Sequence, residues 1–187
     1  MLRAGLAALA CLLAGAALSS NAPLPFKMGG PFELIDDAGN PRNQINPDGH
    51  AQLLFFGYAN CPGICTAALP LIGDTTALLA EQGITVQPLM ITVDPERDMV
   101  GSMDAALAKY HPSFKGLTGS DAALRAARKA FSVQHELAFV DPQYGAIYVH
   151  GSVIFLLNAD GDVLTLFQPI QDAAHVADVA KGYLTTN

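Results

Sequence analysis

Cysteine is scarce in this sequence. There are three cysteines in 187 residues, and only Cys61 and Cys65 lie beyond the apolar N-terminal stretch. A single pair excludes the multi-disulfide scaffold that holds many small exported proteins together. The two thiols are therefore candidates for chemistry, either as a redox couple or as part of a metal site.

Basic clusters and methionine-rich stretches are also lacking. The chain has 10 Lys and Arg against 17 Asp and Glu, a net charge of −7, and no basic patch, so we expect no nucleic-acid partner. The five methionines are scattered and form no metal-binding box, and we expect Met90 and Met103 to fill the core. No internal repeat is present, and the length suits one globular domain.

The first residues are apolar apart from Arg3. A charged start, a short apolar core and small residues at its end predict a secretory signal over residues 1–19, then a linker over 20–31 and a domain over 32–187. An uncleaved membrane anchor is the second interpretation. A lipid attached to Cys11 is the third interpretation. It ranks last because the residues before Cys11 form a poor lipidation motif. All three predict an exported protein, either periplasmic or anchored in the membrane and facing the periplasm.

Hydrophobic patterning divides the remaining chain into strands and helices. The predicted strands are 32–35, 51–58, 84–93, 135–140, 152–157 and 163–167. The predicted helices are 64–82, 102–110, 120–131 and 172–184. This order predicts an α/β fold with a mixed central sheet and helices on both faces. A buried strand that leads into a helix bearing two cysteines indicates a thioredoxin-like fold.

The two cysteines stand in FFGYANCPGICTAALP, residues 55–70, where a buried strand gives way to a helix. If the turn between them is helical, their spacing puts both sulfurs on one face, with Cβ atoms roughly 6 Å apart. A helix N-terminus favours the thiolate, which attacks disulfides and also binds soft metals. A purely structural disulfide is a weaker interpretation, since so short a loop stabilises by about 2–3 kcal/mol at most. Three residues separate the cysteines, where redox motifs usually have two, which weakens the reductase interpretation.

Five histidines could supply a further ligand. Four of them lie in turns, at a strand start or on the last helix, and are expected to be solvated: His50, His111, His135 and His175. His150 directly precedes the apolar strand over 152–157 and on its own could be a partly buried structural residue. In a thioredoxin-like sheet, however, the loop before that strand lies against the cysteine loop. Two thiolates and one imidazole would form a soft site that selects cuprous copper, and an added ligand would admit cupric copper or zinc.

Four motifs in order resemble the Sco/SenC family of exported copper chaperones. They are FFGYANCPGICTAALP (55–70), MITVDPERD (90–98), FKGLTGS (114–120) and YVHGSVIFLLNADGDVL (148–164). The similarity runs from about Phe32 to the C-terminal helix. It differs from the family pattern at Gly63, where Asp is common, at Thr66, where Pro is common, and at Val149, where Asp is common. These three positions bear on copper affinity, thiol pKa and the docking partner.

The resemblance implies a copper chaperone and not an enzyme. It implies a thioredoxin-like fold in which Cys61, Cys65 and His150 bind copper, Cu(I) or Cu(II). The family helps to assemble the dinuclear copper centre of cytochrome c oxidase, so the implied partner is the copper-bearing subunit or another copper client. Some members instead reduce the cysteines of that centre. Oxidation of Cys61 and Cys65 to a disulfide would release the metal.

Two rival functions need only the sulfurs. A periplasmic thiol-disulfide oxidoreductase would use Cys61 and Cys65 without metal and would be indifferent to His150. A peroxide-reducing relative would need one reactive cysteine near an arginine, for which Arg97 and Arg125 are the candidates.

A charged loop follows the buried strand over 84–93. Its members are Asp94, Glu96, Arg97 and Asp98. We expect a solvated loop whose charges pair locally, with a rim beside the metal site as the alternative. Phe56 and Tyr58, just before the cysteines, either shield the site or belong to the core.

Overall fold

The computed structural model describes residues 24–59 and 61–185. The predicted signal or anchor, with Cys11, lies outside these residues. Within the described ranges, no helix is both long enough and apolar enough to cross a membrane.

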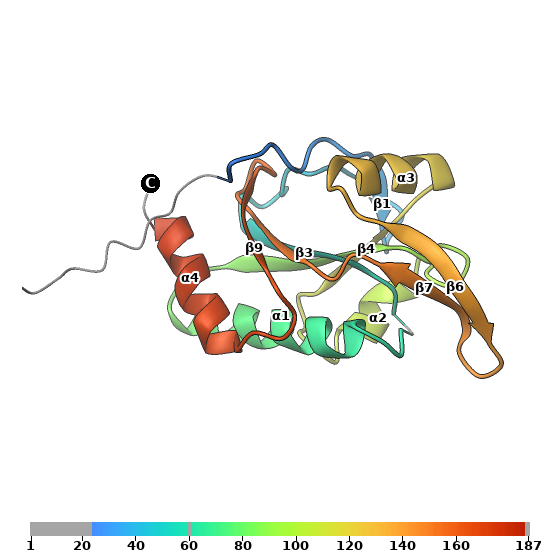
Figure 1. The fold of residues 1–187 in the computed structure, drawn as a ribbon. Coiled ribbons are helices and arrows are strands. Elements are labelled where there is room, and N and C mark those ends of the chain that lie inside the picture. The colour runs from blue at the N-terminus through green and yellow to red at the C-terminus, as the bar shows by residue number, and fades with distance from the viewer. Residues whose placement is uncertain (1–23, 60, 186–187) are drawn as a thin grey trace, which may run out of the picture.

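A mixed sheet forms the centre of the structure, in the order β2-β1-β5-β4-β3-β8-β9, and β6 and β7 form a separate two-stranded sheet. The strands are β1 (Leu34–Asp36), β2 (Pro41–Arg42), β3 (Ala51–Gly57), β4 (Val86–Thr92), β5 (Lys115–Thr118), β6 (His135–Asp141), β7 (Gly145–His150), β8 (Ile154–Leu157) and β9 (Val163–Phe167). The helices are α1 (Cys65–Glu81), α2 (Met103–Leu107), α3 (Asp121–Ala130) and α4 (Ala173–Thr185). Helices α1 and α2 lie on one side of the sheet and α3 on the other, with α4 beside α1 (Figure 1). The predicted mixed sheet with helices on both faces is confirmed.

Strand β3 is the centre of the core. It pairs in parallel with β4 and antiparallel with β8, and the residues from Leu53 to Phe56 are fully buried. Helices cover both faces, which is why the apolar run of this strand is continuous and does not alternate. Its carboxyl end delivers the chain directly to the loop that carries Cys61.

Helix α1 begins at Cys65, so Cys61 lies in the loop before it. The Cys61 N–H donates to the Tyr58 carbonyl over 3.2 Å, and the Thr66 N–H donates to the Gly63 carbonyl over 3.0 Å. Pro62 and Gly63 favour this turn over a helical start. The turn between the cysteines is therefore not helical, so the condition for both sulfurs on one helical face is not met, and only Cys65 belongs to the helix.

Two strands near the site were not expected. β5 falls in the segment 114–120 and adds a parallel strand beside β4. β7 pairs with β6 in a hairpin that extends away from the central sheet (Figure 1). Most side chains of β6 are exposed, including Leu137, Phe139 and Val140. The predicted hairpin of the last two strands is confirmed by the antiparallel pairing of β8 with β9.

Candidate metal centre

Three side chains from distant parts of the chain converge at one point. The sulfurs of Cys61 and Cys65 and a ring nitrogen of His150 all lie within 4.8 Å of one another. The Cys65 Sγ lies 3.7 Å from the His150 Nε2. Bonds of about 2.0–2.3 Å to one ion place two donor atoms at most about 4.6 Å apart. The cluster therefore needs only a small closure to hold a single ion.

Cys61 is the half-buried member of the pair. A hydrogen bond from the Cys65 side chain, with further hydrogen bonds from the N–H groups of Cys65 and Gly63, lowers the pKa of Cys61 to about 4 against the opposing effect of burial. The N–H groups at the start of α1 thus hold a thiolate, as a helix N-terminus is expected to do.

Cys65 is the buried member, with 1% of its surface exposed. Its hydrogen bond to Cys61 and then its burial raise the pKa of the Cys65 thiol. At neutral pH the two cysteines therefore hold one proton between them, and it is bound to the Cys65 sulfur. Both sulfurs are free thiols in this structure.

His150 ends strand β7 and turns its Nε2 toward the sulfurs. Its Nδ1 lies 3.0 Å from the Gly151 carbonyl oxygen, which can only accept a hydrogen bond. The proton therefore sits on Nδ1, and Nε2 keeps the lone pair that a metal requires. The rings of Phe55 and Tyr58 meet the imidazole edge-on, with centroids 5.8 and 5.9 Å away.

Tyr58 and Phe56 have different roles. The Tyr58 ring is buried and packs edge-on against Tyr148, and burial followed by the charge of Cys61 raises the pKa of its hydroxyl. Tyr58 is therefore a wall of the site. Phe56 packs against Phe131 and Phe155 and is plain core.

The charged loop after β4 is less solvated than expected. Asp94 and Asp98 are 1% and 2% exposed, whereas Glu96 is exposed. Asp98 accepts hydrogen bonds from the Thr92 hydroxyl at 2.7 Å and from the Ala59 N–H at 3.1 Å, and burial raises its pKa. The expectation of a solvated loop is wrong for both aspartates, because Asp98 ties β4 to the cysteine loop.

Arg97 fastens the β6–β7 hairpin to the same loop. Its guanidinium pairs with Asp94 and donates to the carbonyls of Tyr144 and, over 2.6 Å, Ala146. It also lies 5.4 Å from the centre of the Tyr58 ring. The other arginine candidate, Arg125, is exposed on α3, on the far side of the sheet.

The remaining histidines stay outside the cluster. His175 is exposed, and His50 and His111 are partly exposed. His135 contradicts the expectation of solvation, because it is half-buried and stacks on Tyr148 with centroids 4.7 Å apart. Burial and then the charge of Arg128 lower the pKa of His135.

Sequence reasoning missed the groups that orient the three donors. Asp98 holds the cysteine loop, the Gly151 carbonyl sets the tautomer of His150, and Phe55 supports its ring. The positions of Asp94 and Asp98 in the sequence could have indicated their role, since acidic residues directly after a buried strand can turn back and bind a neighbouring loop. A backbone carbonyl carries no signal in the sequence.

Relatives of known fold and name match most of the chain. The family model described as SCO1/SenC matches residues 20–185. The chain is 33% identical over 159 residues to the mitochondrial protein SCO2 homolog of Danio rerio, covering 84% of this chain and 57% of that protein. It is 31% identical over 159 residues to the SCO2-like protein of Rickettsia felis, covering 83% and 77% respectively. The chain thus spans a little more than half the length of its fish relative.

A solved structure shares the fold. Arabidopsis thaliana ScoI with copper bound has a TM-score of 0.79 at 26% identity, covering 86% of this chain and 99% of that chain. The thioredoxin-like fold is thereby confirmed. With a family model that covers nearly the whole sequence and relatives above 30% identity, the chain belongs to the SCO1/SenC family.

Proposed function

We propose that this chain binds one copper ion through Cys61, Cys65 and His150 and delivers it to a client protein. The convergence of these three donors within 4.8 Å is the observation that carries the proposal. A related structure, that of Arabidopsis thaliana ScoI, was solved with copper bound. The donors match the preference of copper, because thiolates select soft ions and imidazole suits copper in both oxidation states.

Copper suits this cluster better than zinc. Structural zinc is almost always held by four protein ligands. Among the described residues, no fourth histidine, cysteine or carboxylate joins the group. A three-ligand site leaves room for an incoming ligand, which is what a delivery protein requires.

The shape of the site supports transfer by ligand exchange. A cleft of roughly 290 Å³ lies between the cysteine loop and β7, and Cys61, Tyr148, Val149 and His150 are among its lining residues. Cys65 is buried beneath it. A thiolate or imidazole of the client can enter the cleft and replace Cys61 and His150 first, so that the metal leaves from its exposed side.

The client that fits the family resemblance is the copper-bearing subunit of cytochrome c oxidase. We infer that delivery takes place outside the cytoplasm, in the periplasm or at its membrane face, on the strength of the apolar N-terminal segment in the sequence. Oxidation of Cys61 and Cys65 to a disulfide would remove both sulfur ligands, so the redox state would control loading.

Metal analysis of the reduced protein tests the proposal. We expect close to one copper per chain in the wild type and in His175→Ala, a matched control because His175 is exposed and outside the cluster. Cys61→Ser, Cys65→Ser and His150→Ala should each lose most of the copper. Full copper retention in His150→Ala, together with catalytic disulfide turnover, would instead favour a metal-independent thiol-disulfide oxidoreductase.

A further inference from the structure

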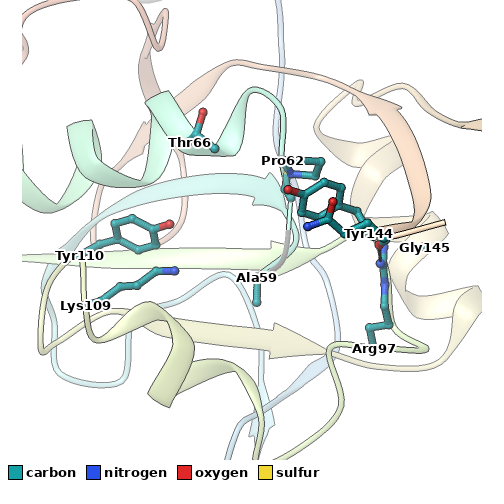
Figure 2. A pocket seen from close by; sticks show the side chains of 10 residues that line it. Ala59, Pro62, Thr66, Arg97, Lys109, Tyr110, Tyr144 and Gly145 are labelled. Carbon is teal, nitrogen blue, oxygen red and sulfur yellow. Dashed lines mark hydrogen bonds between the residues drawn. The ribbon is translucent and has the colours of Figure 1, made fainter. Parts of the chain in front are cut away.

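A second cleft reaches Cys61, and the proposed copper site does not use it. It encloses roughly 630 Å³, and His150 is not among its lining residues. One wall is the cysteine loop with Ala59 and Pro62, and Thr66 at the start of α1 lies above it (Figure 2). The volume is within the range of small-molecule sites.

Each of the opposite walls of this cleft carries one basic side chain. Figure 2 shows Lys109 and Tyr110 on one side, extending toward the space between them and Ala59, with Arg97 and Tyr144 on the other side. No carboxylate is among the lining residues, although the chain has 17 acidic residues against 10 lysines and arginines. When Cys61 is in a disulfide, the lining residues therefore carry no negative charge, although the protein is negative overall.

The two cations of the cleft are not equivalent. Arg97 is neutralised by its ion pair with Asp94. Lys109 is exposed, forms no ion pair with any described residue, and lies 4.8 Å from the centre of the Tyr110 ring. The backbone of Tyr110 presses against α1 at Gly73, where a Cβ would collide with the Tyr110 carbonyl. The backbone that carries Lys109 is thus fixed in place, and the ammonium group of Lys109 is available to a ligand.

The sulfur that this cleft exposes is also the one a reductant could reach. Cys65 is 1% exposed, whereas Cys61 lines the cleft. In a Cys61–Cys65 disulfide, an incoming thiolate would therefore attack the Cys61 Sγ, with Cys65 as the leaving group.

We propose that this cleft binds a low-molecular-weight thiol that carries carboxylates, and that this thiol reduces the Cys61–Cys65 disulfide. This inference rests on the redox part of the proposed function, because the disulfide must form. The first thiolate bonds to Cys61 and releases Cys65, which takes up a proton. A second thiolate attacks the sulfur of the bound thiol and releases Cys61 as a thiolate. Two thiols are oxidised to one external disulfide, and the protein gains two electrons.

Three thiols of similar size test the charge preference. They are 3-mercaptopropionate, which is anionic, 2-mercaptoethanol, which is neutral, and cysteamine, which is cationic. Reduction of the oxidised protein is followed at low salt, with each rate divided by the concentration of thiolate. We expect 3-mercaptopropionate to react about fivefold faster than 2-mercaptoethanol, and cysteamine to react more slowly than either, an effect the size of one surface ion pair. The net charge of −7 alone would produce the opposite order.

Lys109→Gln should abolish this preference, and Lys181→Gln should leave it unchanged. Lys181 is an exposed lysine on α4, so it is matched for charge and exposure. Copper binding by Lys109→Gln should equal that of the wild type, which separates this site from the metal site. Equal rates for the three thiols in the wild type, or a preference retained in Lys109→Gln, would overturn the inference and leave the copper proposal intact. Failure of the two cysteines to form a disulfide under oxidising conditions would remove both this inference and the redox control of loading.

Discussion

The two regions that supply the proposed ligands differ in how they are held. The sulfurs stand at the junction of β3 and α1, where the residues from Leu53 to Phe56 are fully buried. The imidazole stands at the end of β7, in a hairpin outside the central sheet that exposes Phe139 and Val149 by 57% and 58%. One part of the site thus belongs to the core, and the other is attached to it.

This difference indicates where the site can be lost without loss of the fold. The hairpin is joined to the rest of the molecule by a few polar contacts, chiefly the bonds from Arg97 to the carbonyls of Tyr144 and Ala146. Edge-on packing of Tyr148 against Tyr58 adds an apolar contact. Substitutions in the core should act on stability, whereas substitutions at these attachments should act on the metal.

The largest effect on stability is expected from Phe155→Ala in β8. Its side chain is 3% exposed, and its ring contacts Phe131 and Phe56 with centroids 5.2 and 6.1 Å away. Removal of a buried phenylalanine ring costs about 3–5 kcal/mol through lost burial and the cavity that remains. Urea denaturation of the reduced protein measures this loss. A loss below about 1 kcal/mol would mean that β8 is not part of a close-packed core.

A smaller effect, on copper and not on stability, is expected from Arg97→Lys. Lysine keeps the positive charge but cannot donate in a fork to Asp94 and two carbonyls at once. The hairpin should then hold His150 less firmly, and copper affinity should fall about 10- to 100-fold, as it does when groups that orient metal ligands are changed. Competition with a chelator of known affinity measures the change.

A double-mutant cycle decides whether Arg97 acts through the histidine. In a His150→Ala background, Arg97→Lys should cause no further loss of copper affinity, because the ligand it positions is already gone. Additive losses would show that Arg97 acts on the cysteines or on the fold, and would remove the distinction between core and attachment.

The two cysteines differ from each other in burial and in pKa, as the core and the hairpin differ in burial. This difference predicts that the reactivity of Cys61 depends on pH. A lowered pKa means that Cys61 is a thiolate at every pH above about 4, whereas the pKa of Cys65 is raised and it stays protonated. In reduced, metal-free protein, iodoacetamide should modify Cys61 at a rate that is nearly constant between about pH 5 and pH 8 and falls as the pH passes below about 4. At pH 6 it should react at least about tenfold faster than Cys65.

Peptide mapping by mass spectrometry assigns the modified residue. Cys65→Ala removes the largest cause of the lowered pKa, so the fall in the rate should move to higher pH. A rate for Cys61 that rises steeply between pH 7 and pH 9 in the wild type would indicate an ordinary thiol and contradict this account.

The apolar pattern of the sequence was sufficient to predict the central elements. AQLLFFG is a buried strand because helices cover both faces of the sheet, and the Asp-Gly turn near residue 160 joins β8 to β9. The start of α1, predicted at residue 64, is confirmed to within one residue, because the turn at Pro62 and Gly63 comes before the helix that begins at Cys65. β7 was missed because its apolar run is only four residues long, 146–149, and comes just before the longer apolar run that includes β8.

The convergence of the three proposed donors could be predicted from the sequence, but the groups that support them could not. Cys61, Cys65 and His150 stand out by residue type and motif, and chain topology brings them together. The supports depend on contacts that appear only after folding, such as Asp98 with Ala59 and Nδ1 of His150 with the Gly151 carbonyl.

The smallest effect on stability is expected from Phe139→Ala, the same substitution as Phe155→Ala but placed on the hairpin. Phe139 is 57% exposed, so truncation removes little buried area and leaves no enclosed cavity. The free energy of unfolding should change by less than about 1 kcal/mol, and copper stoichiometry should not change. The same urea denaturation, run beside Phe155→Ala, gives a matched comparison. If Phe139→Ala destabilises the protein as much as Phe155→Ala does, the hairpin is part of the cooperative core. The position of His150 would then depend on the whole fold and not on Arg97 and its few polar contacts.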